Sequence, residues 1–319
     1  MNERPEMIGG DEPPLFTVAI CTRNRDALLD EALASVEPQL LGDAELLVID
    51  NGSTDGTPGC VVRWAGVNPR IRGVVESELG LSVARNTALR SARGGWIVFL
   101  DDDATAEPGW LDAFRRAVRS PVSPSQAAFG GPVIPRYEGD RPFWVGAEEN
   151  GLDMGGDVVE FTGRCGPWGG NAAYNRRIAS AVGGFDPSLG RKGDGLASHE
   201  EMDLFERIKL QGGTAWYLPN ARIRHLVPRS RMRLGVQLRI QFASGRSSAI
   251  CRMKLLNSPS ERFFFRLVRC LVAIPHSLLS WAAALLFFLV GRRVHAASSL
   301  FKGTRNAGFG WQSLLGARA

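Results

Sequence analysis

The apolar positions of the first hundred residues fall into short runs that are separated by longer amphipathic segments. The runs are rich in branched and aromatic residues, as strands are. The segments between them space their apolar residues by three and four, so that Leu81, Ala84 and Ala88 share one helix face. Strands that alternate with helices predict an α/β fold, in which a mostly parallel sheet is covered by helices on both faces. We expect strands at 16–21, 45–50, 71–77 and 96–101, and helices at 26–36, after Thr54 and at 81–92.

The pattern changes after residue 120. Residues 120–195 are rich in glycine and proline and hold only short strand-like pieces. A helical pattern at 200–210 ends before Gly212 and Gly213, and short strands are expected at 214–219 and 221–226. From Pro228 onward the chain is basic and helical in pattern, and an apolar run fills 270–290.

Polar residues follow three of the expected strands directly. Thr22 and Arg23 follow the first, Asp50 and Ser53 the second, and Asp101 begins a run of three aspartates after the fourth. The carboxyl ends of parallel strands meet at one sheet edge, where such folds bind ligands. These residue types suit a nucleotide, since arginine binds phosphate and a carboxylate can accept from a ribose or a base. Neither GxGxxG nor GxxxxGK[ST] occurs, so the phosphates need a counter-charge other than a glycine cradle.

The three aspartates, Asp101, Asp102 and Asp103, predict that counter-charge. Adjacent carboxylates repel one another, and burying them is costly unless a cation neutralises them. Mg²⁺ and Mn²⁺ both favour carboxylate oxygens together with substrate phosphates. Side chains alternate in an extended segment, so Asp101 and Asp103 point to the same side and can reach one ion. The alternative is that Asp102 and Asp103 cap the next turn.

A second group of titratable residues begins the helix expected at 200–210. His199, Glu200, Glu201 and Asp203 stand together there, where carboxylates also favour the helix dipole. The residue four after His199 is an aspartate, so the HExxH zinc motif is not present. A carboxylate at this position can act as a general base for a hydroxyl. The spacing alone does not decide between Glu200 and Glu201.

Five stretches together resemble the family 2 glycosyltransferases of the GT-A fold. They read TVAICTRNR, ELLVIDNGSTDGT, GLSVARNTALRSARGGWIVFLDDDA, GGNAAYNRRIASAVGGFDPSLG and HEEMDLFERIKLQGG, and they extend over roughly 16–226 in the order of that family. The resemblance implies an inverting transfer of a sugar from a nucleoside diphosphate to an acceptor hydroxyl. It also implies a divalent metal, Mg²⁺ or Mn²⁺, and a donor that carries UDP, which is favoured, or GDP.

The resemblance assigns roles residue by residue. Glu201 takes the place of the usual aspartate base, which is a departure from the family pattern, and Glu200 is the alternative. His225 matches a histidine that completes the metal or diphosphate site, with a packed core histidine as the alternative. Trp168 is a platform for a sugar or a core residue. The nucleotide-sugar residues implied are Thr22, Arg23, Asp50, Ser53, Arg85, Asn86, Asp101 and Asp102, those beside the sugar and acceptor are Trp168, Gly170 and Asn171, and the metal ligands are Asp101, Asp103 and His225.

The charge of the chain is unevenly distributed. Residues 221–319 hold 17 basic residues against one acid, a net of +16, whereas the preceding residues hold 21 bases against 32 acids, a net of −11. The bases are mixed with an apolar run rather than arranged as a basic face with stacking aromatics, which argues against nucleic acid. The run at 270–290 has the length of a membrane span, but an interfacial helix or a core or oligomer helix also fits.

These observations predict three regions and a location. We expect a disordered lead-in at 1–14, a catalytic domain at 15–228 and a basic helical region at 229–319. The enzyme would act on a glycan or lipid-linked acceptor at the cytoplasmic face of a membrane, in cell-surface polysaccharide or glycolipid synthesis. The five scattered cysteines support neither a disulfide framework nor a zinc site. A catalytically silent nucleotide-sugar scaffold and a metal-dependent nucleotidyltransferase are the alternative functions.

Overall fold

The computed structural model describes residues 13–145, 151–163, 166–193, 195–256 and 258–315. Most of the expected lead-in at 1–14, and Cys165, lie outside the described residues. The described cysteines, Cys21, Cys60, Cys251 and Cys270, are free thiols.

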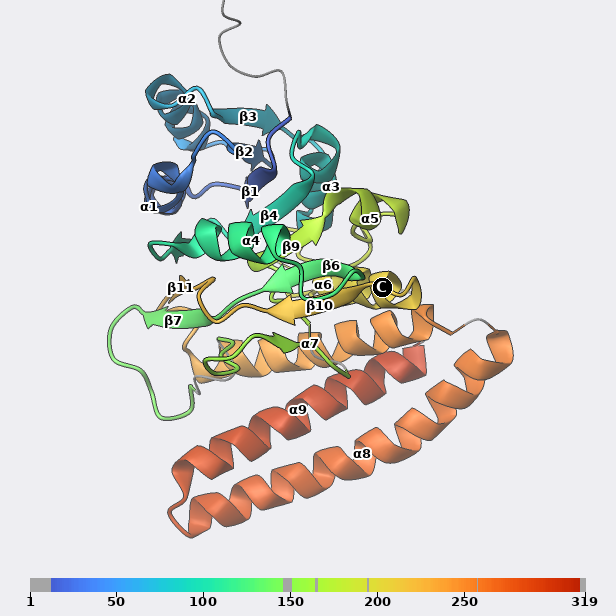
Figure 1. The fold of residues 1–319 in the computed structure, drawn as a ribbon. Helices are drawn as coiled ribbons and strands as arrows, with labels where there is room; N and C mark the ends of the chain where they lie inside the picture. The colour runs from blue at the N-terminus through green and yellow to red at the C-terminus, as the bar shows by residue number, and fades with distance from the viewer. Residues whose placement is uncertain (1–12, 146–150, 164–165, 194, 257, 316–319) are drawn as a thin grey trace, which may run out of the picture.

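An eight-stranded sheet with the order β3-β2-β1-β4-β9-β6-β10-β8 forms the centre of the molecule (Figure 1). The first four strands in this order are parallel, as the alternating pattern predicts. The short strands of the Gly- and Pro-rich region extend the sheet, and β9 is antiparallel to both of its neighbours. The strands are β1 (Phe16–Thr22), β2 (Ala44–Asp50), β3 (Ile71–Val75), β4 (Trp96–Leu100), β6 (Gln126–Gly130), β8 (Val159–Glu160), β9 (Asn171–Asn175) and β10 (Thr214–Tyr217).

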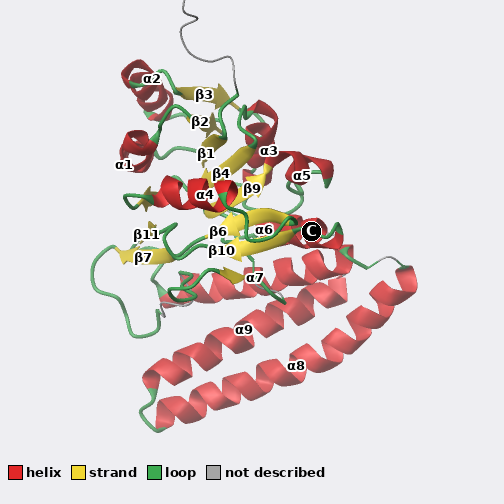
Figure 2. Ribbon diagram, viewed as in Figure 1, coloured by secondary structure: helices red, strands yellow, loops and turns green. Residues whose placement is uncertain are grey.

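Helices cover both faces of this sheet (Figure 2). Successive residues of a strand point to opposite faces, so Val18 and Ile20 of β1 join one buried cluster and Ala19 joins the other. Residues of α1, α2 and α4 complete the first cluster, and those of α3, α5 and α6 complete the second. These elements are α1 (Asp26–Val36), α2 (Thr57–Val67), α3 (Leu81–Ser91), α4 (Trp110–Arg119), α5 (Arg176–Ala181) and α6 (Glu200–Leu210), with a 3₁₀ turn at Glu37–Gln39.

A second, three-stranded sheet lies beside the carboxyl end of β4. Its order is β5 (Ala104–Ala106), β11 (Ile223–Val227) and β7 (Val133–Tyr137). Because β5 directly follows the three aspartates and pairs with β11, His225 is opposite Ala104 in the register. A residue more than a hundred positions away in the chain is thereby fixed next to Asp103.

Three long helices form a layer on one side of the domain: α7 (Leu234–Lys254), α8 (Pro259–Leu289) and α9 (Arg293–Leu315). α9 packs against both of the others, and α8 is outermost (Figure 1). α8 begins well before the expected residue 270, because Ser258 and Glu261 form a reciprocal capping box and Pro259 takes the first helical position. Among the described helices, α8 is the one that is long and apolar enough to cross a membrane, and only 17% of its most apolar window is buried.

Candidate functional site

A cavity of about 600 Å³ opens at the carboxyl end of the parallel strands. The residues after β1 and β4, the glycines before β9 and the start of α6 all contribute to its wall. The polar residues after β1 and β4 therefore meet at one edge of the sheet, as the order of strands predicts, and Asn51 after β2 lines the cavity as well. Helices α7 and α9 also contribute to the wall, which the sequence did not indicate.

Arg25 neutralises part of the aspartate cluster. One guanidinium nitrogen, Nη1, lies 2.9 Å from Asp102 Oδ1 and 2.8 Å from Asp103 Oδ2. Burial nevertheless raises the pKa of Asp102 to about 7, and the Asp103 charge adds to the effect. One arginine is thus shared by two buried carboxylates, and Asp101 stays free of it.

Asp101, Asp103 and His225 form a candidate metal centre. Each offers a ligand atom, and these atoms all lie within 4.8 Å of one another. The Nε2 atom of His225 is 3.2 Å from Asp103 Oδ1, and its other ring nitrogen is buried with no hydrogen-bond partner in the described chain. Burial by itself would raise the pKa of Asp103, but His225 and Arg25 hold it below its usual range. Two carboxylates and an imidazole at one point fit a divalent cation.

Arg85 connects this centre to α6. Its side chain is buried, with Nη1 2.7 Å from Glu200 Oε1 and Nη2 3.4 Å from Asp101 Oδ1. The guanidinium also stands over the rings of Phe99 and Phe185 at 5.7 and 5.5 Å. Burial alone would lower the pKa of Arg85, but the carboxylates of Glu200 and Asp101 raise it, so the charge is retained.

The Gly169-Gly170-Asn171 segment makes room for these groups. A Cβ at Gly170 would lie 2.0 Å from Asp101 Oδ2, and one at Gly169 would lie 3.0 Å from the Arg85 guanidinium nitrogens. Asn171 is fully buried and does not face the cavity. In place of the predicted contact with sugar or acceptor, its amide bonds the Pro132 and Ala221 carbonyls and accepts from the Trp110 indole.

The start of α6 carries the two candidate bases. Glu200 is buried against Arg85, and burial followed by the charge of Glu201 raises its pKa to about 7. Glu201 is partly exposed and lines the cavity. His199 precedes them with a φ of 75°, a left-handed conformation that is uncommon for residues other than glycine. Burial lowers the pKa of His199 to about 4, so its ring is neutral.

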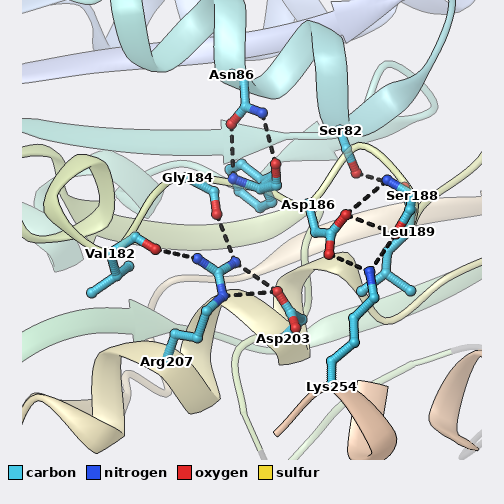
Figure 3. A network of polar contacts seen from close by, with 11 residues as sticks. Ser82, Asn86, Val182, Gly184, Asp186, Ser188, Leu189, Asp203, Arg207 and Lys254 are labelled. Atoms are coloured by element: carbon cyan, nitrogen blue, oxygen red, sulfur yellow. Dashed lines mark hydrogen bonds and ion pairs between the residues drawn. The ribbon is translucent and has the colours of Figure 1, made fainter. Parts of the chain in front are cut away.

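Asn86 forms hydrogen bonds within the protein, next to Arg85 in the sequence. Its amide donates to the Phe185 carbonyl and accepts from the Phe185 N–H, at 2.7 and 2.8 Å (Figure 3). In the same network, Ser82 donates to the Leu189 carbonyl, and Arg207 bonds the carbonyls of Val182 and Gly184. Both polar ends of Asn86 are used within the protein, so we assign it a supporting role in place of the predicted contact with nucleotide.

The remaining predicted residues lie around the cavity at different depths. Thr22 is buried and Arg23 is exposed, and both line the cavity. Asp50 accepts from the Ser53 N–H at 2.9 Å, and neither of them is among the lining residues. Trp168 lines the cavity, and its ring centroid is 6.2 Å from that of His225.

Several lining residues were missed by sequence reasoning. Arg25 is the last residue of the quoted stretch TVAICTRNR, and only the structure shows that it reaches the aspartates. Arg191 and Arg231 come from loops without a recognisable pattern, and Gln241 and Arg305 come from helices that were expected to contact a membrane. The excess of arginines over carboxylates after residue 228 was the available signal.

Comparison with known proteins identifies the protein family to which the chain belongs. A family model described as glycosyl transferase family 2 matches residues 17–183, which is just over half of the chain. The chain belongs to glycosyltransferase family 2.

The matches to known proteins have low sequence identity but extend over most of the chain. A glucosyl-dolichyl phosphate glucuronosyltransferase of Haloferax volcanii is 26% identical over 220 residues, covering 66% of this chain and 68% of that protein. The succinoglycan biosynthesis protein ExoM of Rhizobium meliloti is 29% identical over 240 residues and 72% of each chain. The mannosyltransferase PcManGT from Pyrobaculum calidifontis, solved with GDP-Man and Mn²⁺, aligns with a TM-score of 0.64 at 21% identity, covering 93% of this chain and 86% of its own. The fold is therefore the GT-A fold.

Proposed function

We propose that this glycosyltransferase moves a sugar from a nucleoside diphosphate sugar to an acceptor hydroxyl with inversion at the anomeric carbon. The observation that carries the proposal is that Asp101, Asp103 and His225 share one cavity with Glu201. The donor diphosphate would lie near the aspartates, where Arg25 and Arg231 also line the wall. UDP remains the favoured nucleotide on the frequency of UDP donors in the family, and GDP is the second candidate.

The donor set at Asp101, Asp103 and His225 fits a divalent metal. Carboxylate oxygens suit Mg²⁺ and Mn²⁺ alike, and the imidazole favours Mn²⁺. The buried ring nitrogen of His225 without a partner supports this fit, because such a group is costly unless a ligand meets it. When bound, the ion acts as a Lewis acid that offsets charge on the departing diphosphate. Arg25 and Arg85 hold the aspartates that would bind it in place.

Glu201 is the proposed general base. Both glutamates line the cavity, but Glu200 is tied to Arg85 through Oε1 and its Oε2 atom is buried, whereas Glu201 is partly exposed. Glu201 would take the proton of the acceptor hydroxyl while that oxygen forms a bond to the anomeric carbon. The bond from that carbon to the diphosphate oxygen breaks on the opposite face, and its electron pair leaves with the diphosphate. No covalent sugar–enzyme intermediate is required.

A binding experiment tests the donor site. Nucleoside diphosphates are titrated into wild type, Asp103→Ala and the exposed control Asp112→Ala, each with and without Mn²⁺. We expect one nucleotide to bind in a metal-dependent manner and at least tenfold more weakly to Asp103→Ala, with the control unchanged. Metal-independent binding would remove the proposed role of the aspartates and favour a silent nucleotide-sugar scaffold, and no binding at all would remove the proposed donor site.

A rate measurement tests the base. Glu201→Gln should lose at least a hundredfold in transfer rate and keep its nucleotide affinity, because a proton acceptor is worth 10²–10⁴ in rate. If Glu200→Gln shows that behaviour and Glu201→Gln stays active, Glu200 is the base. If both stay active, the proposed proton transfer is wrong.

We further propose that the enzyme acts at the cytoplasmic face of a membrane, on a glycan or lipid-linked acceptor, with α8 lying in the bilayer interface. From Phe263 onward most of the exposed side chains of α8 are apolar, and Leu271 and Leu279 are 67% and 69% exposed. Arg292 and Arg293 stand exposed at its end, where they suit anionic headgroups. If α8 spanned the bilayer, the packed α9 would go with it and place the exposed Lys302 in hydrocarbon, at a cost of about 3 kcal/mol.

Cysteine labelling distinguishes an α8 that lies in the bilayer interface from an α8 that spans the bilayer. Val294→Cys, near the turn between α8 and α9, is compared with Val62→Cys on the catalytic domain, both in a background without other cysteines. Both valines are exposed. In sealed inside-out vesicles an impermeant maleimide should label both sites from outside. Labelling of residue 62 alone would show that the turn lies on the opposite side and that the helix pair spans.

A further inference from the structure

Helices α7 and α9 build one wall of the cavity. Ile240, Gln241 and Ser244 of α7 and Arg305 of α9 line it, beside the segment that leads into α6. The two sides are joined, since the Ser198 N–H donates to the Ser247 hydroxyl of α7 at 3.1 Å. The residues that bind the proposed donor come from the sheet edge instead. This wall therefore stands on the side where an acceptor would approach Glu201.

Arg305 brings an uncompensated positive charge into this wall. Its Nε atom donates to Gln241 Oε1 at 2.7 Å, and Nη2 bonds the same oxygen. Gln241 is 3% exposed, so it holds the guanidinium from a fixed position but adds no negative charge. Within the described part of the chain no carboxylate oxygen lies within 4.0 Å of Arg305, and its exposed side chain is accessible from the cavity. The neutral His199 nearby carries no charge of either sign.

The position of Arg305 is set by close backbone packing. A Cβ on Gly245 of α7 would lie 1.9 Å from the Arg305 carbonyl oxygen, and one on Gly308 would lie 2.0 Å from the Phe242 carbonyl oxygen. α7 is in turn held to the catalytic domain by Lys254, which pairs with Asp186 (Figure 3). The backbone that carries Arg305 is therefore held against α7, and α7 is tied to the catalytic domain.

The opposite side of α9 packs against α8. Gly303 leaves room for the Trp281 ring, since a Cβ there would lie 2.5 Å from it, and a Cβ on Gly310 would lie 3.2 Å from the Ala273 Cβ of α8. One helix thus presents a cation to the cavity and supports the apolar face of α8 on its other side. A ligand that has both an anionic group and a hydrocarbon part matches this arrangement.

We infer that the wall of α7 and α9 is a subsite for the phosphate of a lipid-linked acceptor, with Arg305 as its anion-binding residue. This inference rests on the proposed function, because it names the acceptor class of the same cavity. A guanidinium binds phosphate through charge-assisted hydrogen bonds. The lipid part of the acceptor stays in the bilayer that α8 contacts, so the phosphate enters from the side of the helical layer.

The experiment measures binding of farnesyl phosphate, farnesol and inorganic phosphate to the full chain in phosphatidylcholine nanodiscs. The variants are Arg305→Gln, Arg305→Lys and the matched control Arg246→Gln. Arg246 makes an equivalent bond between the same two helices, from Nε to Gln312 Oε1 at 2.8 Å, and does not line the cavity. The control thus separates loss of an interhelical bond from loss of the cavity charge.

We expect wild type to bind farnesyl phosphate at least tenfold more tightly than either farnesol or inorganic phosphate. Arg305→Gln should lose this preference, whereas Arg305→Lys and Arg246→Gln should stay within about threefold of wild type. Equal loss in Arg246→Gln, or equal binding of farnesol, would overturn the inference. Inorganic phosphate binding as tightly would show a free-phosphate site rather than a lipid one.

Nucleoside diphosphate binding on the same samples separates this inference from the proposed function. It should be unchanged in Arg305→Gln, and a tenfold loss would place Arg305 in the donor site and overturn the inference. If wild type binds no nucleotide but still binds farnesyl phosphate through Arg305, the proposed function fails and the lipid phosphate site stands.

Discussion

His199 should make the protein lose stability on mild acidification, and His199→Asn should remove that loss. The ring is held neutral by burial, with a pKa of about 4 against an ordinary 6.5, and Arg305 and Arg252 nearby act in the same direction while Glu200 opposes them. Between these two values the unfolded chain binds a proton that the folded chain does not. Unfolding is therefore favoured as the pH falls from 6.5 toward 4.

The magnitude follows from the two pKa values. At pH 5 the unfolded imidazole lies about 1.5 units below its pKa and the folded one is still mostly neutral, and each unit is worth about 1.4 kcal/mol. The contribution of His199 to the free energy of unfolding should thus fall by about 2 kcal/mol between pH 7.5 and pH 5. Asparagine is the chosen replacement because it tolerates the left-handed backbone at this position.

The wild-type curve alone would hide this effect. Glu200 has a pKa raised to about 7, so its ionised form is unfavourable in the folded state and stability rises as the pH falls through that value. The two neighbours therefore act in opposite directions over the same pH range. Only the difference between wild type and His199→Asn isolates the histidine, since Glu200 remains in both.

Urea unfolding followed by tryptophan fluorescence at pH 7.5 and pH 5 makes the measurement. Wild type should lose about 2 kcal/mol relative to His199→Asn between the two conditions. A difference in unfolding free energy between the two proteins that is the same at both pH values reports only lost packing. Curves that run parallel within about 0.3 kcal/mol would show that His199 is not held neutral and would refute the reasoning.

Three further predictions concern individual contacts. Asn171→Ala should lower the free energy of unfolding by about 3 kcal/mol in urea melts, because it leaves the Trp110 indole and two carbonyls without their partner. Gly245→Ala should cost about 2 kcal/mol in the same assay, since its Cβ meets the Arg305 carbonyl, whereas Gly235→Ala, which meets nothing within 4 Å, should not. Cys21 should react with iodoacetamide at pH 8.5 at least a hundredfold more slowly than free cysteine, because burial raises the pKa of its thiol to about 12.

Much of the fold follows from local pattern. The strands and helices expected in the first hundred residues appear within a few residues of their predicted bounds, since each strand is apolar and each helix keeps one apolar face. The antiparallel β9 and the small sheet of β5, β11 and β7 depend on pairing between distant segments, which no local period reports. The early start of α8 follows from its N-cap residue, Ser258, which lies outside the apolar run that defined the expected helix.

The site is predictable where its functional residues directly follow the end of a strand. Asp101 and Asp103 point to one place because they alternate along an extended segment, and His225 joins them as the resemblance implied. Asn86 and Asn171 each follow a cavity-lining residue in the sequence, but their side chains point into the protein. Their amides donate hydrogen bonds to loop carbonyls there. Arg305 could not be predicted, since its place depends on how α9 crosses α7.

The glycine contact between α7 and α9 has a consequence for how such enzymes can be recombined. The residues of the proposed donor site all precede residue 232, and the wall formed by α7 and α9 comes from a separate run of chain after residue 233. If the α7–α9 wall is the acceptor subsite that we propose, exchanging that run between relatives would transplant acceptor preference while leaving the choice of activated sugar untouched. The graft would succeed only where both crossing glycines, Gly245 and Gly308, travel with it, because together they set the spacing of the transplanted wall.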